Sequence, residues 1–457
     1  MKIVILGAGQ VGSSVAEALV SEQNDITVVD LDPERLRALQ DRLDLRTVTG
    51  SAAHPSVLAS AGIEDADMMI AVTQSDETNL VACKLAHQLF NVPTRIARVR
   101  ATEYLMNDMV LGKDAFSVDL AICPEQVLTD YIVRLIEFPE ALQVLEFAEG
   151  KVSLVAVRSF QGGPLVGHPL KDIKKHMPAV DTRVAAIFRG DRPIFPEGDT
   201  VIEANDEVFF LAATQNIRQV MRELRRMDKP VKRVMIAGGG NIGLRLARAL
   251  ERDYSVKVIE HNKVRCELLA DTLTSALVLY GDVTDESLLE IEHVDEMDTY
   301  IAVTNDDENN IMSSLLAKRL GARRVVTLIN RRAYVDLLQS GQIDIAISPA
   351  QATIGQLLAH VRHGDVTRVH SLRRGAAEAL EAVVHGDAKS CDLIGRRIGE
   401  ILLPKGSAIG AVVRGDEVMM GHHDIEVRPG DRIIIFVADK KVLPKVEKLF
   451  QVGVGFF

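Results

Sequence analysis

The sequence is poor in aromatic residues and in cysteine. It contains no tryptophan, and Phe, Trp and Tyr together make up 4% of its 457 residues. The four cysteines are isolated and form no C-x-x-C pair, so the sequence offers neither a disulfide framework nor a zinc-binding pattern. This usage suits a reducing cytosol. The cysteines are Cys83, Cys123, Cys266 and Cys391.

Long hydrophobic segments and basic tracts are missing as well. No apolar run reaches the ~20 residues that a bilayer-spanning helix needs. The N-terminus has the pattern of a strand interrupted by glycines, which is not that of a signal peptide. We therefore expect any role at a membrane to come through a partner. The formal net charge is −11, which argues against a nucleic-acid-binding protein.

The N-terminal stretch has the pattern of a buried strand, a glycine-rich turn and the start of a helix. Ile3 to Leu6 is a continuous apolar run, as expected for a parallel strand that is covered on both faces. A G-x-G-x-x-G sequence follows it. In such a turn Gly7 permits the tight bend, Gly9 lets the backbone approach a pyrophosphate, and Gly12 lets helix and strand pack closely.

An acidic residue completes this nucleotide-binding pattern. The next apolar run, Ile26 to Val29, ends in Asp30. Asp30 lies 23 residues after Gly7, the spacing expected of a carboxylate that binds ribose hydroxyls. The amides of Gln10 and Val11 are expected at a helix N-terminus, where anions are favoured. We interpret the segment as a nucleotide site, and a purely structural turn is the alternative.

The same pattern occurs twice in the chain. A second glycine run, Gly238 to Gly243, follows the first at an offset of 231 residues, and Glu260 takes the place of the ribose acid. Beyond the middle of each half the offset is 225 residues, so the second half is a slightly shorter copy of the first. A repeat of this length indicates a duplicated pair of domains, because solenoid units are far shorter. The further matches at 231 are Gly50 with Gly281, Thr73 with Thr304, Asp76-Glu77 with Asp307-Glu308, and Asn79 with Asn310.

Alternating strands and helices in each half predict an α/β fold with two tandem doubly wound, Rossmann-like parallel sheets. After each of them the hydrophobic period changes to two, which predicts a small β-rich α+β lobe. The predicted domains are residues 1–138, 139–230, 231–364 and 365–457. Pro124 opens an amphipathic helix to about Glu137. The pattern fits a core helix of the first lobe as well as a crossover helix that pairs lobes or subunits.

The segments after the glycine lobes do not favour an enzyme. Hydride transfer needs an acid or base beside the substrate, and the small lobes carry no His, Lys or Cys at matching positions. The repeated polar residues after the fourth strand of each half border the crevice where open α/β sheets bind ligands. Acids at a helix start are the simpler interpretation of Asp76-Glu77 and Asp307-Glu308. Contact with a ligand, metal or partner is the alternative.

The two halves differ in their arginines. Arg95, Arg98 and Arg100 lie on or beside the fifth strand of the first half, and no arginine stands at 328 or 329 in the second. Arginine clamps phosphates well, so the first site looks better suited to a triphosphate, with solvated surface charge as the alternative. His360 and His363 share a helix face, but no further ligands complete a set, so we expect no metal site.

These features together resemble the TrkA family, the cytosolic nucleotide-binding subunits of bacterial Trk potassium-uptake systems, which carry two regulator-of-potassium-conductance (RCK) domains. The resemblance covers essentially the whole chain. It includes Val166 to Ile173 in the first small lobe, whose counterpart Ile394 to Ile401 has Arg397-Ile398 in place of Pro169-Leu170. That departure puts a ligand function of the second small lobe in doubt.

The resemblance implies a regulatory protein without enzymatic activity. Such subunits assemble as a tetrameric ring at the cytoplasmic face of a potassium-translocating membrane subunit, sense NAD, NADH, ATP or ADP, and bias the pore. An NAD-dependent oxidoreductase and a regulator of another transporter remain the alternatives. The predicted nucleotide contacts are Gly7, Gly9, Gln10, Val11, Gly12, Asp30, Gly50, Ser51, Thr73, Arg98 and Arg100 in the first half, and Gly238, Gly240, Asn241, Ile242, Gly243, Glu260, Gly281, Asp282 and Thr304 in the second.

Overall fold

The computed structural model of the chain divides into two compact units. One consists of residues 1–130, 235–252 and 256–354, and the other of residues 131–234, 253–255 and 355–457. The structure describes residues 1–20, 24–190, 192–224, 230–331, 334, 342–361, 366–372, 377–387, 390–438 and 440–450. The predicted boundaries at 230 and 364 fall beside or on residues outside this set, so the four-domain division stays a prediction.

The first unit contains both Rossmann-like sheets. The first sheet has six parallel strands in the order β3-β2-β1-β4-β5-β6, so the order reverses between β1 and β4. Ligands of open α/β sheets bind at such a switch point. The strands are β1 (Lys2–Leu6), β2 (Asp25–Asp30), β3 (Arg46–Thr49), β4 (Met68–Ala71), β5 (Thr94–Arg98) and β6 (Leu120–Ile122).

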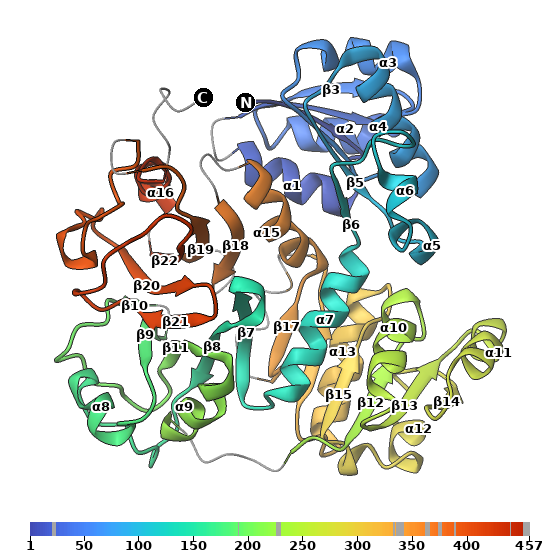
Figure 1. Cartoon of the computed structure of the whole chain (residues 1–457). Coiled ribbons are helices and arrows are strands. Elements are labelled where there is room, and N and C mark those ends of the chain that lie inside the picture. Colours follow the sequence, from blue (N-terminus) through green and yellow to red (C-terminus); the bar gives the residue numbers. More distant parts are fainter. Residues whose placement is uncertain are drawn as a thin grey trace. The chain divides into compact units, whose positions relative to one another are not determined.

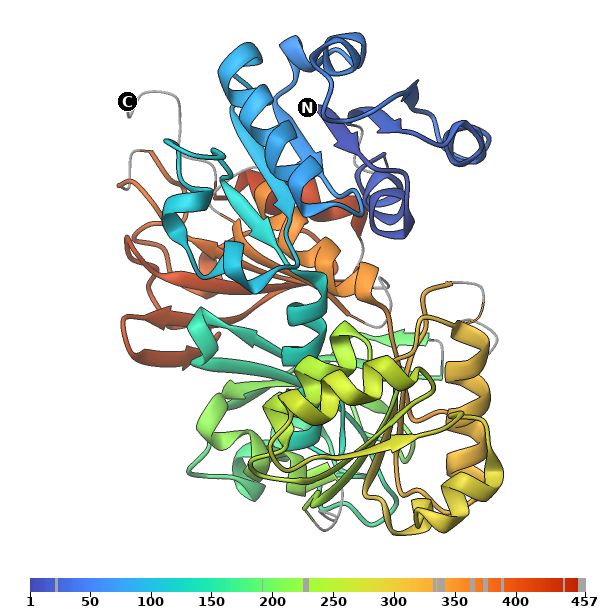
Figure 2. The same ribbon diagram turned by 90° about the vertical axis from the view of Figure 1, so that its right-hand side faces the viewer.

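Helices cover both faces of this sheet (Figure 1 and Figure 2). Two of these helices begin at a side-chain cap. Asp32 accepts the amides of Glu34 and Arg35 at the start of α2, and Ser75 accepts the amide of Thr78 at the start of α4. The helices are α1 (Gln10–Val20), α2 (Pro33–Gln40), α3 (Pro55–Ser60), η1 (Ile63–Asp65), α4 (Asp76–Phe90), α5 (Thr102–Leu105) and α6 (Asp108–Leu111).

The second sheet repeats the first, with the order β14-β13-β12-β15-β16-β17. The predicted pair of doubly wound sheets is therefore confirmed. Its strands are β12 (Arg233–Ala237), β13 (Ser255–Glu260), β14 (Leu277–Tyr280), β15 (Thr299–Ala302), β16 (Val325–Leu328) and β17 (Ile345–Ile347). Its helices are α10 (Asn241–Leu250), α11 (Lys263–Thr272), α12 (Glu286–Ile291), η5 (Val294–Glu296) and α13 (Asp307–Arg319).

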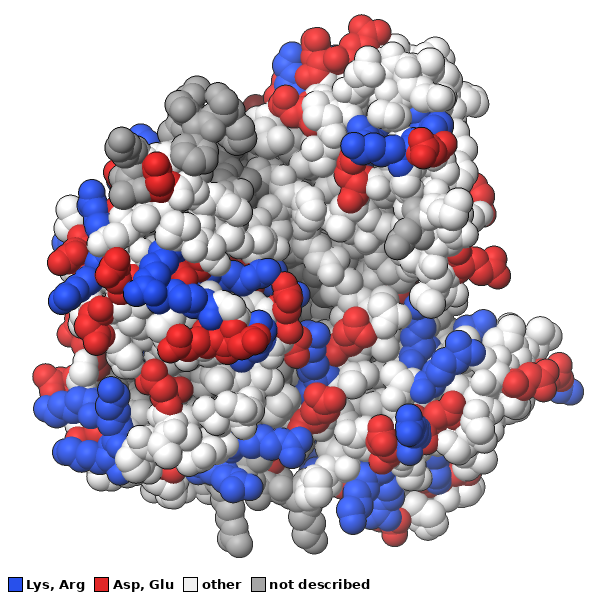
Figure 3. Space-filling view, viewed as in Figure 1, with Lys and Arg blue, Asp and Glu red and all other residues white. Residues whose placement is uncertain are grey.

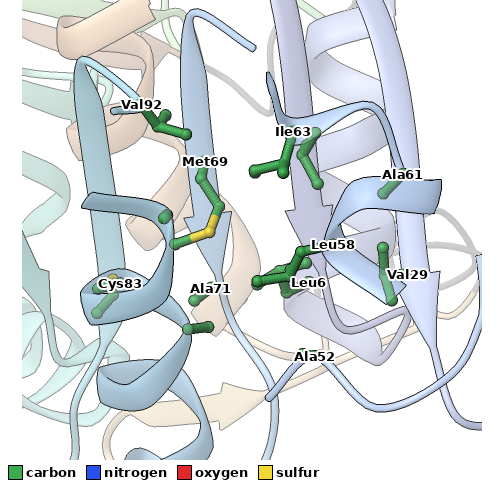
Figure 4. Close-up of a cluster of buried hydrophobic side chains, with 14 of the residues drawn as sticks. Leu6, Val29, Ala52, Leu58, Ala61, Ile63, Met69, Ala71, Cys83 and Val92 are labelled. Carbon is green, nitrogen blue, oxygen red and sulfur yellow. The ribbon is translucent and has the colours of Figure 1, made fainter. Parts of the chain in front are cut away.

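An apolar core packs the strands of the first sheet against α3 and α4. Leu6, Val29 and Met69 from three neighbouring strands meet Leu58 of α3 and Cys83 of α4 (Figure 4). All five side chains are buried. Burial raises the pKa of the Cys83 thiol to about 12, so this cysteine packs as an apolar residue and is not a nucleophile.

The second unit holds the two small lobes, each built on a five-stranded sheet with antiparallel pairing, which confirms the predicted small α+β lobes. The first sheet has the order β10 (Arg192–Ile194), β9 (Thr182–Arg189), β11 (Glu207–Ala213), β8 (Val152–Arg158), β7 (Ala141–Phe147). The second has the order β18 (Val366–Leu372), β19 (Ala377–Val383), β22 (Arg432–Val437), β20 (Ser407–Arg414), β21 (Glu417–Met420).

A common apolar core joins these two lobes. Phe147, Phe209 and Leu211 of the first lobe pack in one cluster with Ile434 and Phe436 of the second. Short helices complete the unit. They are η2 (Ala148–Gly150), η3 (Leu170–Asp172), α8 (Ile173–His176), η4 (Thr214–Asn216), α9 (Ile217–Leu224), η8 (Ile398–Glu400), η9 (Lys440–Val442) and α16 (Leu443–Lys448).

Two amphipathic helices lead from the Rossmann-like sheets into the small lobes. They are α7 (Pro124–Glu137), which follows β6, and α15 (Pro349–Val361), which follows β17. Each helix begins in the first unit and ends in the second. In the part of the chain that the structure describes, no helix is both long enough and apolar enough to span a bilayer.

Candidate functional site

The first glycine turn is shaped by two close backbone approaches and one open position. Gly7 has a positive φ of 108°, and a Cβ there would lie 3.0 Å from the amide nitrogen of Thr73. A Cβ on Gly12 would lie 1.8 Å from the carbonyl oxygen of Gly7. By contrast, a Cβ on Gly9 would meet nothing within 4 Å. Gly7 and Gly12 are therefore needed by the fold, and Gly9 leaves room for a ligand at the start of α1.

Asp30 braces this turn from the end of β2. Its Oδ2 accepts the amide of Ala8 at 2.5 Å, and its Oδ1 accepts the amide of Asp32 at 2.9 Å. A carboxylate oxygen has two acceptor sites, so each oxygen keeps capacity for a hydroxyl donor. The geometry fits the predicted contact with ribose, and the same carboxylate has a structural role in holding the turn.

A cavity of about 590 Å³ opens beside the turn at the carboxyl edge of the first sheet. Nine of the residues predicted for the first site line it: Gly7, Gly9, Gln10, Val11, Asp30, Gly50, Ser51, Thr73 and Arg98. Leu31, Asp32, Arg35, Gln74 and Ser75 line it too and were not predicted. The available signal for four of them was their place in the segment after a strand, where ligands of such sheets bind, and Arg35 lies in the first turn of the following helix α2.

The second Rossmann-like lobe supplies part of the same cavity. Two of its predicted site residues, Ile242 and Thr304, line the cavity beside the first glycine turn. Asn305, Leu328 and Asn330 from the ends of β15 and β16 also contribute. The first site is therefore built by residues more than 200 positions apart in the sequence.

The arginines of the first half have different surroundings. Arg98 lines the cavity and pairs with Glu125 at the start of α7, Nη2 to Oε1 at 2.7 Å. The Nε of Arg98 is buried and has no hydrogen-bond partner among the described residues. Arg100 does not line the cavity: its guanidinium contacts Asp76 and the carbonyl oxygen of Gln74. Of the two predicted phosphate ligands, only Arg98 therefore faces the cavity.

Arg95, the third arginine of this stretch, is a structural residue. It is buried, its Nε donates to the carbonyl of Ser117 at 2.7 Å, and its Nη2 pairs with Asp119 at 2.8 Å. A buried ion pair of this kind holds neighbouring segments together and leaves no donor free for a ligand.

The repeated polar residues after β4 and β15 hold strand ends together. The Asn79 side chain is buried and bonds Thr73 at the end of β4, and its amide donates to the carbonyl of Arg98 on β5. In the second lobe the Asn310 amide donates to the carbonyl of Leu328. This shared bond makes Leu328 the structural counterpart of Arg98.

The buried acids Asp76 and Asp307 also have structural partners. Asp76 Oδ2 accepts the amides of Arg100 and Ala101 at 2.8 Å. Asp307 accepts the amides of Asn330 and Arg331 at 2.9 and 2.8 Å. Asn330 is therefore the counterpart of Arg100. These bonds favour the simpler interpretation of the two acids as helix-start residues that anchor the following strand.

The second glycine turn is closed more tightly around its acid. Glu260 is buried, and its Oε2 accepts the amide of Gly239 at 2.8 Å. Arg265 donates from Nε to the carbonyl of Gly239 at 2.8 Å. A Cβ on Gly239, where the first turn has Ala8, would lie 2.3 Å from a terminal methyl group of Leu269 and 3.1 Å from Oε2 of Glu260, so a side chain here would have to displace both groups.

The other predicted residues of the second site lie around this turn. Gly238 has a positive φ of 105°, Gly240 precedes α10 with open space beside it, and Gly243 packs on the carbonyl of Gly238. Asn241 starts α10. The amide of Gly281 bonds the carbonyl of Glu260 at 3.0 Å. Hydrogen bonds from Thr284 lower the pKa of Asp282.

One arginine connects the two Rossmann-like lobes next to the first cavity. Arg245 of α10 donates from Nη1 to Oε1 of Gln126 at 2.8 Å and from Nη2 to the carbonyl of Arg100 at 2.7 Å. Gln126 follows Glu125 in α7, and Arg100 follows Arg98 after β5. Arg245 thus holds both segments that carry the ion pair of the cavity.

The remaining candidates are metal-binding groups and basic surface. Among the described residues no group of three or more His, Cys, Asp and Glu side chains is placed to hold a metal ion. His360 bonds the carbonyl of Gln356, and His363 lies outside the described residues. Lys and Arg are interleaved with Asp and Glu over the face seen in Figure 3, so this face offers no basic patch for nucleic acid.

Comparison with known proteins identifies relatives over the full length. The TrkA-N domain family matches residues 3–124 and 234–349, and the TrkA-C domain family matches residues 154–225. The Trk system potassium uptake protein TrkA of Halomonas elongata is 60% identical over 457 residues, covering 100% of both chains. The protein of the same name from Vibrio alginolyticus is 57% identical and covers 99% of each chain.

Solved structures share the fold. The crystal structure of the GsuK RCK domain has a TM-score of 0.62 at 18% identity, covering 98% of this chain and 95% of that one. The GsuK channel bound to NAD has the same TM-score and identity and covers 98% of this chain and 79% of that one. At such low identity the likeness concerns the fold alone.

Proposed function

The chain belongs to the TrkA family of Trk system potassium uptake proteins, and on this premise we propose that it is the nucleotide-binding regulatory subunit of a potassium-uptake system. It binds NAD, NADH, ATP or ADP between its Rossmann-like lobes and biases a potassium-translocating membrane subunit from the cytoplasmic face. It performs no catalysis of its own, and it works as a homo-oligomer, a tetramer in the ring arrangement that the family resemblance implies.

One observation carries the ligand assignment: a glycine turn without a side chain at Gly9 opens onto a cavity that also contains Asp30 and Arg98. The backbone amides at a helix start bind phosphates, and a carboxylate at the end of the second strand binds ribose hydroxyls. An arginine in the same cavity can bind an additional phosphate group. The fold shared with NAD-bound and ADP-bound GsuK supports this choice of ligands.

Regulation follows if ligands bind two arrangements of the lobes with different affinity. The first cavity is suited to this because the first lobe supplies the turn and the second supplies Ile242, Thr304 and Asn330. A ligand that touches both lobes stabilises one arrangement over another. The carboxylates at Asp30 and Glu260 should also repel a 2′-phosphate, so NADP is disfavoured.

Calorimetry of the purified full chain with NADH, ATP and NADPH tests the binding proposal. NADH and ATP should bind, and NADPH should bind at least tenfold more weakly. Equal affinity for NADH and NADPH contradicts the assignment of the ribose acids. Prolonged incubation should return both nucleotides unchanged. Turnover of NADH with an oxidised substrate would revive the oxidoreductase alternative.

A further inference from the structure

The outer edge of the second Rossmann-like lobe exposes large apolar side chains. Val264 and Leu268 lie on α11, and Leu277 and Tyr280 lie on β14; their exposed fractions run from 44% to 74%. We call these four residues the outer apolar edge. Large apolar side chains that are exposed on neighbouring elements of a folded domain can mark an interaction site.

The strand at this edge has no neighbour on its outer side within the sheet. β14 is the end strand of the second sheet, and among the described residues it pairs with β13 alone. Leu279 packs in the core with Leu288 and Leu289 of α12. Because side chains alternate along a strand, Leu277 shares the α12 face, and Tyr280 takes the α11 face beside Val264 and Leu268. Apolar residues therefore flank the open edge on both faces.

The fold itself does not require these residues. In the first lobe, the same positions of α2 and β3 carry Glu34, Ala38, Arg46 and Thr49. Natural edge strands are protected by charges of this kind, because an uncharged edge invites pairing with another chain. The second lobe has the same architecture without that protection.

The charges of α11 also run against its own dipole. Lys263 stands at its start and Asp271 in its last turn, both exposed, and it has no acid in the first turn and no base in the last. The equivalent helix α2 has Glu34 in the first turn and Arg37 in the last, the favourable order. A helix with this unfavourable charge order is stabilised when a second, antiparallel helix lies beside it. Each terminal charge then lies next to the opposite charge and the opposite dipole end of the neighbouring helix.

We propose that the outer apolar edge docks a second copy of this chain around a two-fold axis normal to the sheet. In that arrangement β14 pairs antiparallel with β14 of the partner, and α11 lies antiparallel to the partner's α11. Each face of the sheet continues onto the same face of the partner's sheet. Val264, Leu268 and Tyr280 then pack against the same three residues of the second copy. Lys263 comes next to the partner's Asp271, which makes the surface complementary to itself.

The interface uses no residue of the first cavity, so it is tested without nucleotide. The first variant is made in the full-length protein. It replaces two residues of β14 by their first-lobe counterparts, Arg46 and Thr49, through Leu277→Arg and Tyr280→Thr. Light scattering should give half the particle mass of the parent. Leu402→Arg, at a 90% exposed leucine of the second small lobe, is the control and should leave the mass unchanged.

A charge exchange makes the test independent of any folding defect in that variant. Lys263→Asp places an acid opposite the partner's Asp271 and should weaken association roughly tenfold, because both symmetric pairs are lost. Lys263→Asp with Asp271→Lys should restore it. A parent that is a 50.0 kDa monomer at micromolar concentration overturns the proposal. An unchanged particle mass in every folded edge variant also overturns it. If an edge variant keeps its particle mass but no longer captures the potassium-translocating subunit, the proposal is overturned too, because the edge then binds that subunit and not a second copy of this chain.

Discussion

Arg98 and Glu125 form an ion pair inside the first cavity, with Nη2 of the arginine 2.7 Å from Oε1 of the carboxylate. Arg98 ends β5 and Glu125 is the second residue of α7. Of the two arginines predicted to bind phosphate, Arg98 faces the cavity, and the Glu125 carboxylate neutralises its charge. If a polyphosphate binds as proposed, we expect it to share Arg98 with Glu125 or to displace Glu125, and the charge of the ligand would then act on the start of α7.

Arg98→Ala should weaken ATP binding at the first site about tenfold more than NADH binding. The guanidinium offers charge-assisted hydrogen bonds to the extra phosphate, which contribute about 1.5–3 kcal/mol. Arg100→Ala is the matched control, since that side chain is held by Asp76 and Gln74 outside the cavity. Calorimetry with both ligands measures the difference. Equal losses for ATP and NADH in Arg98→Ala would make this arginine a general structural residue.

Glu125→Gln should strengthen ATP binding several-fold and leave NADH binding nearly unchanged. The substitution keeps the shape of the side chain and removes the negative charge that competes with phosphate for Arg98. Titration of ATP and ADP at two salt concentrations measures the effect, which should shrink at high salt. A weaker affinity for ATP in this variant would show that the carboxylate supports the ligand and does not compete with it.

Arg245→Ala should uncouple the second lobe from the first site. In the parent, ATP should slow hydrogen exchange of α10 amides, because Arg245 joins α10 to Gln126 and to the backbone at Arg100. In the variant that protection should stop at the first lobe. Arg248→Ala on the exposed face of the same helix is the control. Full protection of α10 in Arg245→Ala contradicts the coupling.

Acidification should destabilise the small lobes through His370. Desolvation lowers the pKa of this histidine to about 4, although part of its surface stays exposed. Its Nε2 lies 3.0 Å from the carbonyl oxygen of Glu146, so the neutral ring donates there. Arg368 and Arg134 lower the pKa further, and Glu381 opposes them.

The sign follows from the direction of this shift. Above pH 6.5 the ring is neutral in both states; as the pH falls from 6.5 towards 4, the unfolded chain takes up a proton that the folded chain does not, so stability falls. The loss should be about 2 kcal/mol by pH 4, discounted for the partial exposure. Denaturant unfolding of His370→Gln should show a flatter pH dependence than the parent, and the exposed His360→Gln should not. An unchanged slope in His370→Gln would assign the pH dependence to other groups.

The sequence by itself determined the two Rossmann-like sheets. Strand, glycine turn and helix start lie within about ten residues of one another, and the residues Gly7, Gly12, Gly238 and Gly243 are required by close backbone approaches inside each turn. The predicted ribose-binding acids, Asp30 and Glu260, were found from a fixed spacing along the same unit. Local patterns of this kind are readable because the physical cause and its effect are neighbours in the chain.

Only the tertiary structure decided which side chains share a cavity. Arg98 ends β5 and Arg100 follows two residues later, yet Arg98 lines the cavity while Arg100 donates its amide to Asp76 and its guanidinium contacts Asp76 and Gln74. Ile242 and Thr304 were predicted for the second site and line the first cavity. Hydrophobic periodicity records that a face is buried, but not which distant surface covers it, because packing between lobes depends on the summed shape of residues hundreds of positions apart.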